Sequence, residues 1–183
     1  MEWDKEELPK RKKNRLENYD YSSCGSYFIT ICTQNRRSVL SRIVGGDVLD
    51  APSVELLPYG KIADKYINQL SAFYDNILVE RYVIMPNHIH MLLFIKPIGD
   101  IAFESELLLE NGASRTSPPT RQHSVVSGFV STFKRYFNKE CGIKLWQRGF
   151  YDHIIRNSKD YEEHINYILQ NPMRWYYDVY MEE

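Results

Sequence analysis

The sequence has few cysteines, and their placement excludes two classes of protein. Only three occur among 183 residues, at Cys24, Cys32 and Cys141, and no two of them form a CxxC pair. An odd number at wide spacing argues against a disulfide framework and against a cysteine-ligated zinc site. We interpret them as packing or surface thiols.

Signals for membranes and secretion are also missing. No run of about 18 apolar residues is present to cross a bilayer, and the segment MEWDKEELPKRKK lacks the apolar stretch of a secretory leader. We therefore expect a cytoplasmic protein with no membrane partner. Since 43% of the residues are apolar and 14% aromatic, the chain can bury the core of a single domain over 1–183.

The formal net charge of -1 conceals segments of opposite sign. Residues 1–46 carry nine basic against six acidic side chains and residues 111–160 carry nine against three, whereas 47–110 and 161–183 are acidic. The densest cluster, KRKKNR, lies in the basic N-terminal segment 1–20. Such clusters can meet phosphates, although most short charge runs are simply solvated.

Hydrophobic periodicity predicts the order β-α-β-β-α-β followed by a last helix. Strands are expected at 27–34, 76–85, 88–95 and 145–155, and helices from Pro58, over 126–137 and over 157–170, where Pro172 stops the last one. Residues of about 99–122 lose this periodicity and are expected to form a flexible insertion. The order is typical of the α+β ferredoxin-like split βαβ fold, an antiparallel sheet with helices on one face.

His88 and His90 are the first candidates for chemistry. Residues two apart in a strand share a face, with Cα atoms about 7 Å apart, so two imidazoles can converge on one ion. A lone histidine in an apolar run is more often a hydrogen-bonded core residue. Two at this spacing beside a Pro-Asn turn favour a metal site over packing.

The last helix supplies a second candidate pair. On a wheel of about 100° per residue, Tyr167 falls nearly opposite the apolar stripe, and Asn171 follows one turn later. The stripe consists of Tyr161, Ile165, Ile168 and Leu169. The phenol of Tyr167 could approach a phosphate while the amide oxygen of Asn171 binds an ion nearby. A surface tyrosine and a helix-end cap explain the two residues equally well.

Four segments together carry a family resemblance: YDYSSCGSYFITICTQNRR, YVIMPNHIHMLLFI, LWQRGFYDHIIRN and DYEEHINYILQNPMRW. In length and order they closely resemble the REP-associated tyrosine transposases, relatives of the single-tyrosine transposases of small bacterial insertion sequences, over nearly the whole chain. The resemblance implies that His88 and His90 bind a divalent metal and that Tyr167 attacks DNA. It assigns the third ligand to Asn171, with adjacent Gln170 as the alternative, since the insertion-sequence relatives typically carry glutamine there.

The activity implied by the resemblance is that of a metal-dependent endonuclease and strand transferase acting on single-stranded DNA beside a hairpin, often a repeated palindrome. Mg²⁺ or Mn²⁺ suits two imidazoles and an amide oxygen, although zinc stays open. The ion is needed because a phenol, with an ordinary pKa of about 10, is a poor nucleophile at neutral pH. Attack would give a 5′-phosphotyrosine link that keeps the bond energy for rejoining.

The same resemblance gives the basic segments a role in tracking phosphates, with Trp146, Phe150 or Tyr151 stacking on unpaired bases. Exposed charge and core aromatics remain the alternatives. The expected phosphate contacts are Lys10, Arg11, Lys12, Lys13, Arg15, Lys134, Arg135, Arg148 and Arg156. A monomer and a homodimer that exchanges the tyrosine helix both fit.

Two other functions stay open at this point. One is a phosphodiesterase that uses a metal-bound water, with the tyrosine only positioning substrate. The other is a hairpin-binding protein without cleavage activity, which needs the basic surface but not the histidines.

Overall fold

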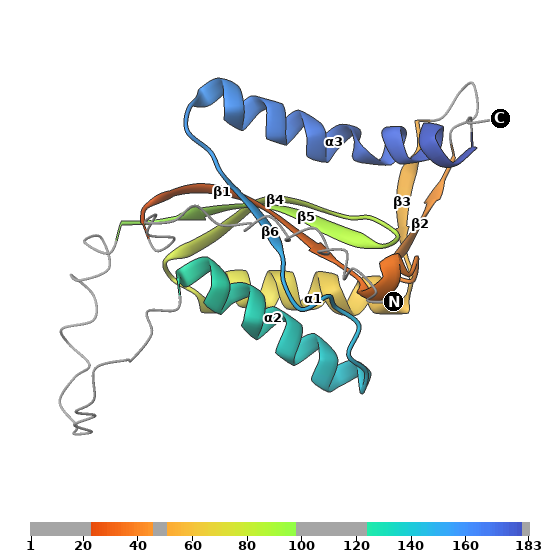
Figure 1. The fold of residues 1–183 in the computed structure, drawn as a ribbon, viewed down its shortest axis with the longest axis horizontal. Coiled ribbons are helices and arrows are strands. Elements are labelled where there is room, and N and C mark those ends of the chain that lie inside the picture. The colour runs from red at the N-terminus through yellow and green to blue at the C-terminus, as the bar shows by residue number, and fades with distance from the viewer. Residues whose placement is uncertain (1–22, 46–50, 98–123, 181–183) are drawn as a thin grey trace, which may run out of the picture.

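The computed structural model describes residues 23–45, 51–97 and 124–180. Figure 1 shows three layers, with α1 and α2 on one side of a central sheet and α3 on the other. The basic segment 1–20 and the expected insertion at about 99–122 lie outside the described residues. None of the helices in the described ranges has the length and apolar character needed to span a membrane.

The central sheet has four antiparallel strands in the order β4-β5-β1-β6. These are β1 (Gly25–Cys32), β4 (Ile77–Ile84), β5 (His88–Ile95) and β6 (Tyr151–Ile154). Helix α1 (Pro58–Phe73) directly precedes β4, α2 (Val125–Cys141) lies between β5 and β6, and α3 (Ser158–Tyr180) follows. This is the strand order of the ferredoxin-like fold, so the predicted fold class is confirmed.

The two faces of the sheet have different neighbours because side chains alternate along a strand. Ile29, Ile31, Ile89 and Met91 are fully buried in the core beneath α1 and α2. On the other face, Phe28 and Leu92 pack against Ile168 of α3. The β1–β5 register pairs Thr30 with His90 and Cys32 with His88, so both histidines lie on the face that α3 covers.

Local sequence explains how α1 begins and packs, and where α2 begins and ends. Pro58 occupies the first turn of α1, where its missing N–H costs nothing. A Cβ at Gly60 would lie 2.0 Å from the backbone oxygen of Leu40, so α1 can approach that segment only through a glycine. The Ser124 hydroxyl accepts the Ser127 N–H to start α2, and Gly142, at φ 67°, ends it.

Two short strands were not expected from the sequence. β2 (Ser41–Val44) and β3 (Ser53–Leu56) form a separate two-stranded sheet that contacts α3. The strand expected at 145–155 is shorter than predicted, because only Tyr151–Ile154 pairs with β1. Trp146 instead packs beside Phe133 and Phe137, with ring centroids 5.4 and 4.8 Å away. The apolar pattern there came from a loop in which Leu145 and Trp146 are buried.

The predicted end of the last helix before Pro172 is wrong. α3 continues through this proline, although the ring removes the N–H that would bond the carbonyl of Ile168. Tertiary contacts on both sides of the proline oppose that cost. Asn171 is buried, and the Trp175 ring lies 5.9 Å from the ring of His88.

Candidate metal and tyrosine site

The imidazoles of His88 and His90 lie side by side under α3, with ring centroids 4.5 Å apart. Their Nδ1 atoms are engaged locally, at 2.7 Å from Asn87 Oδ1 for His88 and at 2.8 Å from Thr30 Oγ1 for His90. Nε2 of His90 is buried and has no hydrogen-bond partner among the described residues. An imidazole held through one nitrogen with the other left for a ligand is the usual arrangement of a metal-binding histidine.

Burial sets the charge of this pair. It lowers the pKa of His88 to about 4, assisted by the nearby guanidinium of Arg36, while a hydrogen bond with Asn171 acts in the opposite direction. It lowers the pKa of His90 to about 3, assisted by His88 and His164. Both rings are therefore neutral at pH 7, which is the form that binds metal ions.

Tyr167 and Asn171 lie against the same pair. The Tyr167 ring centroid is 5.1 Å from that of His90, and the buried Asn171 side chain hydrogen-bonds His88. Gln170, the alternative third ligand, is exposed, and its Oε1 accepts from Arg174 at 3.3 Å. The structure thus brings the four sequence-predicted candidates together within one chain, with Asn171 rather than Gln170 facing the histidines.

The orientation of α3 differs from the helical-wheel prediction. Leu169, placed on the buried stripe, is 60% exposed, whereas Tyr167, placed opposite, is half-buried against Phe28 and Leu92. The face of α3 toward the sheet includes the polar residues His164 and Asn171, which hydropathy assigns to solvent. Tyr167 therefore points toward the histidines, and the wheel placement was wrong.

Two arginines beside the site were not singled out as functional from the sequence. The Arg174 guanidinium lies 5.3 Å from the centre of the Tyr167 ring. Arg36 ends a short turn, η1 (Gln34–Arg36), in which Asn35 and Arg36 adopt φ values of 57° and 52°. Left-handed backbone at non-glycine residues is uncommon and gathers at functional sites. One feature of the sequence could have pointed to Arg36, namely the basic dipeptide Arg36-Arg37 that follows the strand expected at 27–34.

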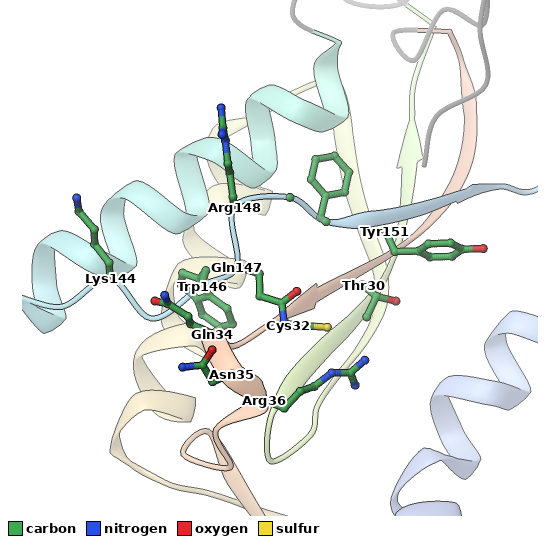
Figure 2. Close-up of a pocket in the computed structure, with 12 residues that line it drawn as sticks. Thr30, Cys32, Gln34, Asn35, Arg36, Lys144, Trp146, Gln147, Arg148 and Tyr151 are labelled. Carbon is green, nitrogen blue, oxygen red and sulfur yellow. The ribbon is translucent and has the colours of Figure 1, made fainter. Parts of the chain in front are cut away.

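A cavity of about 740 Å³ opens beside η1 and the loop before β6. Figure 2 shows that Arg36, Lys144 and Arg148 contribute side chains around it. Thr30 and Tyr151 line this cavity and also a neighbouring one of about 420 Å³ that contains His90 and Tyr167. A polar, cationic hollow is therefore adjacent to the histidine and tyrosine site.

Lys134 has a structural role that the sequence did not reveal. Its Nζ donates to the backbone oxygens of Gln147 and Gly149, at 2.9 and 2.7 Å, and so holds one wall of the larger cavity. Burial lowers the pKa of Lys134 to about 8. Its predicted contact with phosphate stays a prediction.

The other predicted phosphate contacts are dispersed. Arg148 is exposed and lines the larger cavity, and Arg156 is exposed just before α3. Arg135 lies over the Tyr136 ring on α2, on the opposite side of the sheet from α3 (Figure 1). Lys10, Arg11, Lys12, Lys13 and Arg15 fall outside the described residues. Of the predicted stacking aromatics, Tyr151 is 52% exposed, while Trp146 belongs to the core.

A separate cluster of His153, Asp160 and His164 was missed by sequence reasoning. Its ligand atoms all lie within 4.8 Å of one another, so the cluster could hold a metal ion. Asp160 and His164 are four apart on α3, a spacing that places them on one helix face. The sequence could have predicted that Asp160 and His164 share a helix face. It could not have predicted that His153 of β6 lies beside them.

Comparison with known proteins gives relatives along most of the chain. No family model matches. A Haemophilus influenzae protein described as uncharacterized is 30% identical over 173 residues, which is 92% of this chain and 91% of that protein. A REP-associated tyrosine transposase of Escherichia coli K12 is 26% identical over 155 residues, or 84% of this chain and 70% of that one.

A solved structure supports the fold. A REP-associated tyrosine transposase bound to a REP hairpin matches with a TM-score of 0.56 at 23% identity, over 88% of this chain and 74% of the other. At this identity the match shows a shared architecture.

Proposed function

We propose, because this chain belongs to the family of REP-associated tyrosine transposases, that it nicks and rejoins single-stranded DNA beside a hairpin with Tyr167 as nucleophile. The observation that carries the proposal is the convergence of Tyr167 with two neutral imidazoles, one of which has a buried, unpaired Nε2. The hairpin bound to the solved relative supports hairpin DNA as the substrate.

The donor set fits a divalent ion, for which we propose Mg²⁺ or Mn²⁺. His88 and His90 would hold the ion through Nε2, and Asn171 through its amide oxygen, which gives a mixed nitrogen and oxygen site. A buried polar atom without a partner is costly, so the unpaired Nε2 of His90 is best explained by a ligand. When bound, the ion supplies Lewis-acid stabilisation of negative charge on the scissile phosphate.

Residues of this chain would carry out the transfer of the DNA 5′-phosphate to the protein. The phenol oxygen of Tyr167 attacks phosphorus and the bond from phosphorus to the 3′-oxygen breaks. The phenol loses one proton and the departing 3′-oxygen gains one, leaving a 5′-phosphotyrosine and a free 3′-hydroxyl. Arg36 is close enough to His88 to act on its pKa and would bind a phosphate oxygen, while Arg174, which lies over the Tyr167 ring, would offer a second cation to the phosphate. A later attack by a 3′-hydroxyl reverses the chemistry without ATP.

The cationic cavity would receive the strand next to the scissile phosphate. Arg36, Lys144 and Arg148 offer charge for phosphates, and the exposed ring of Tyr151 lies where this cavity meets the one that contains Tyr167. A charged groove with an open aromatic ring suits single-stranded DNA, because any base can stack on the ring.

Hairpin DNA labelled at either end tests the proposal. With Mn²⁺, the 3′ label should remain on the protein after denaturation and the 5′ label should leave on a fragment with a 3′-hydroxyl. EDTA and Tyr167→Phe should each abolish the adduct. Tyr177→Phe, which changes an exposed tyrosine on the same helix, should retain it.

Two outcomes would replace the proposal with another function. Cleavage by Tyr167→Phe without an adduct would identify a phosphodiesterase that uses a metal-bound water. Hairpin binding by the wild-type protein with no cleavage in Mg²⁺ or Mn²⁺ would identify a binding protein.

A further inference from the structure

His153, Asp160 and His164 meet where β6 leads into α3. His153 Nε2 is 3.0 Å from each carboxylate oxygen of Asp160, and His164 Nδ1 is 3.1 Å from Oδ1. The two imidazole rings stack at 4.6 Å with 14° between their planes. Ligands on a tetrahedral ion with bonds of about 2.1 Å lie about 3.4 Å apart, which is close to these separations. His164 Nδ1 also lies 2.8 Å from the backbone oxygen of Asp160, so a bound ion would replace that hydrogen bond.

The carboxylate is already ionised and oriented. Burial raises the pKa of Asp160, but hydrogen bonds from His153 and the Arg156 N–H, together with the nearby imidazoles, lower it overall. The Arg156 N–H lies 3.0 Å from Oδ2 and fixes the carboxylate from behind, as outer-shell donors do in metal sites. The side chains of His153, Asp160 and His164 are 36, 18 and 21% exposed, so an ion and a water can enter from solvent.

We propose that His153, Asp160 and His164 form a second metal site, for Zn²⁺ or another divalent ion that accepts tetrahedral nitrogen and oxygen ligands. Two imidazoles and one carboxylate, with water in the fourth position, match the preference of Zn²⁺ and of its spectroscopic substitute Co²⁺. The site is separate from the proposed ion at His88 and His90, and it shares no residue with it.

The position of this site gives it a mechanical consequence. His153 belongs to β6, whereas Asp160 and His164 belong to the first turns of α3, so a bound ion cross-links the sheet to the helix. Tyr167 follows His164 by three residues, about one turn. The ion therefore fixes the start of the helix that presents the tyrosine, independently of any ion that acts on DNA.

Titration with Co²⁺ tests the site without using DNA cleavage. The His88→Ala/His90→Ala variant, stripped with EDTA, should bind one Co²⁺ per chain with an intense visible band of tetrahedral type, and Zn²⁺ should displace it. Adding His153→Gln should weaken Co²⁺ binding about 100-fold. Glutamine keeps a hydrogen-bond donor for Asp160 but is a poor ligand, so this change separates metal binding from simple pairing. Glu162→Gln removes an exposed carboxylate from the same helix, outside the three proposed ligands, and should leave Co²⁺ binding unchanged.

Wild-type stoichiometry gives a second measurement that does not depend on the double variant folding. The wild-type chain should take up one more equivalent of Zn²⁺ than His153→Gln, and Zn²⁺ should raise the melting temperature of the wild type more than that of His153→Gln. Absence of the Co²⁺ band, or a binding curve unchanged by His153→Gln, would overturn the second site. Neither result depends on whether the chain cleaves DNA, so the two proposals fail separately.

Discussion

Arg36 combines a left-handed backbone conformation with a position beside His88. If its guanidinium binds the scissile phosphate, Arg36→Ala should lower the single-turnover rate of hairpin cleavage about 10- to 100-fold. That range corresponds to about 1.5–3 kcal/mol for a hydrogen bond to a charged group. Lys139→Ala removes an exposed charge from α2, on the other side of the sheet, and should leave the rate near that of the wild type. Equal losses in both variants would mean that overall charge, not position, matters.

The buried imidazoles also predict how stability depends on pH. The folded-state pKa values of His88 and His90, about 4 and about 3, lie below the ordinary value of 6.5, so the unfolded chain binds more protons at acidic pH. In metal-free buffer the free energy of unfolding should therefore fall as pH drops from about 6.5 toward 4, by up to about 1.4 kcal/mol per pH unit for each histidine.

Urea denaturation at pH 7.5, 6 and 5 measures this slope. His88→Gln/His90→Gln removes both titrating groups and should show a shallower loss of stability with acid. Parallel curves for the wild type and the double variant would contradict the burial of two neutral imidazoles.

At the scale of single residues, the sequence predicted the histidine pair, because strand alternation alone brings the two rings to one face of the sheet. It could not predict Thr30 or Arg36 as neighbours, since their proximity depends on the β1–β5 register and on the backbone of η1. The roles of Tyr167 and Asn171 came from the family resemblance. Their placement beside the histidines agrees with that resemblance, although the wheel had turned Tyr167 away from the sheet.

Among the secondary-structure elements, α1 depends on one residue without a side chain. Gly60→Ala would place Cβ 2.0 Å from the Leu40 backbone oxygen and should destabilise the fold by about 1–3 kcal/mol, as overpacking does. Gly128→Ala in α2 meets open space and should stabilise it by about 0.5–1 kcal/mol. Thermal and urea unfolding of the two variants should therefore shift in opposite directions. Stabilisation of both variants would mean that helix propensity outweighs the close approach at Gly60, and destabilisation of both would contradict the open space at Gly128.

The elements that sequence analysis placed well are those with a regular apolar pattern. α1, α2, β4 and β5 follow simple helix or strand periodicity and were predicted with small errors at their ends. α3 was misjudged because its buried face contains His164 and Asn171, and because tertiary contacts carry it through Pro172. Hydropathy has no means of recognising a polar face that is buried against a site.

In the molecule as a whole, Tyr167 lies beside His90 of the same chain. We therefore predict cleavage in cis. Tyr167→Phe and His88→Ala/His90→Ala should each be inactive alone, and mixing them should restore no adduct formation on labelled hairpin DNA. Recovery of activity in the mixture would show that α3 exchanges between two chains, and a concentration series would give the affinity of that exchange.

Alternation along β1 and β5 has a consequence for how this protein can change over time. Ile29, Ile31, Ile89 and Met91 face α1 and α2, while Thr30, His88 and His90 face α3, although they are next to one another in sequence. Substitutions in the first set should change thermal stability, whereas substitutions in the second should change the proposed chemistry. A laboratory selection for heat resistance should therefore accept changes at the positions that face α1 and α2 while the alternate positions that face α3 stay fixed.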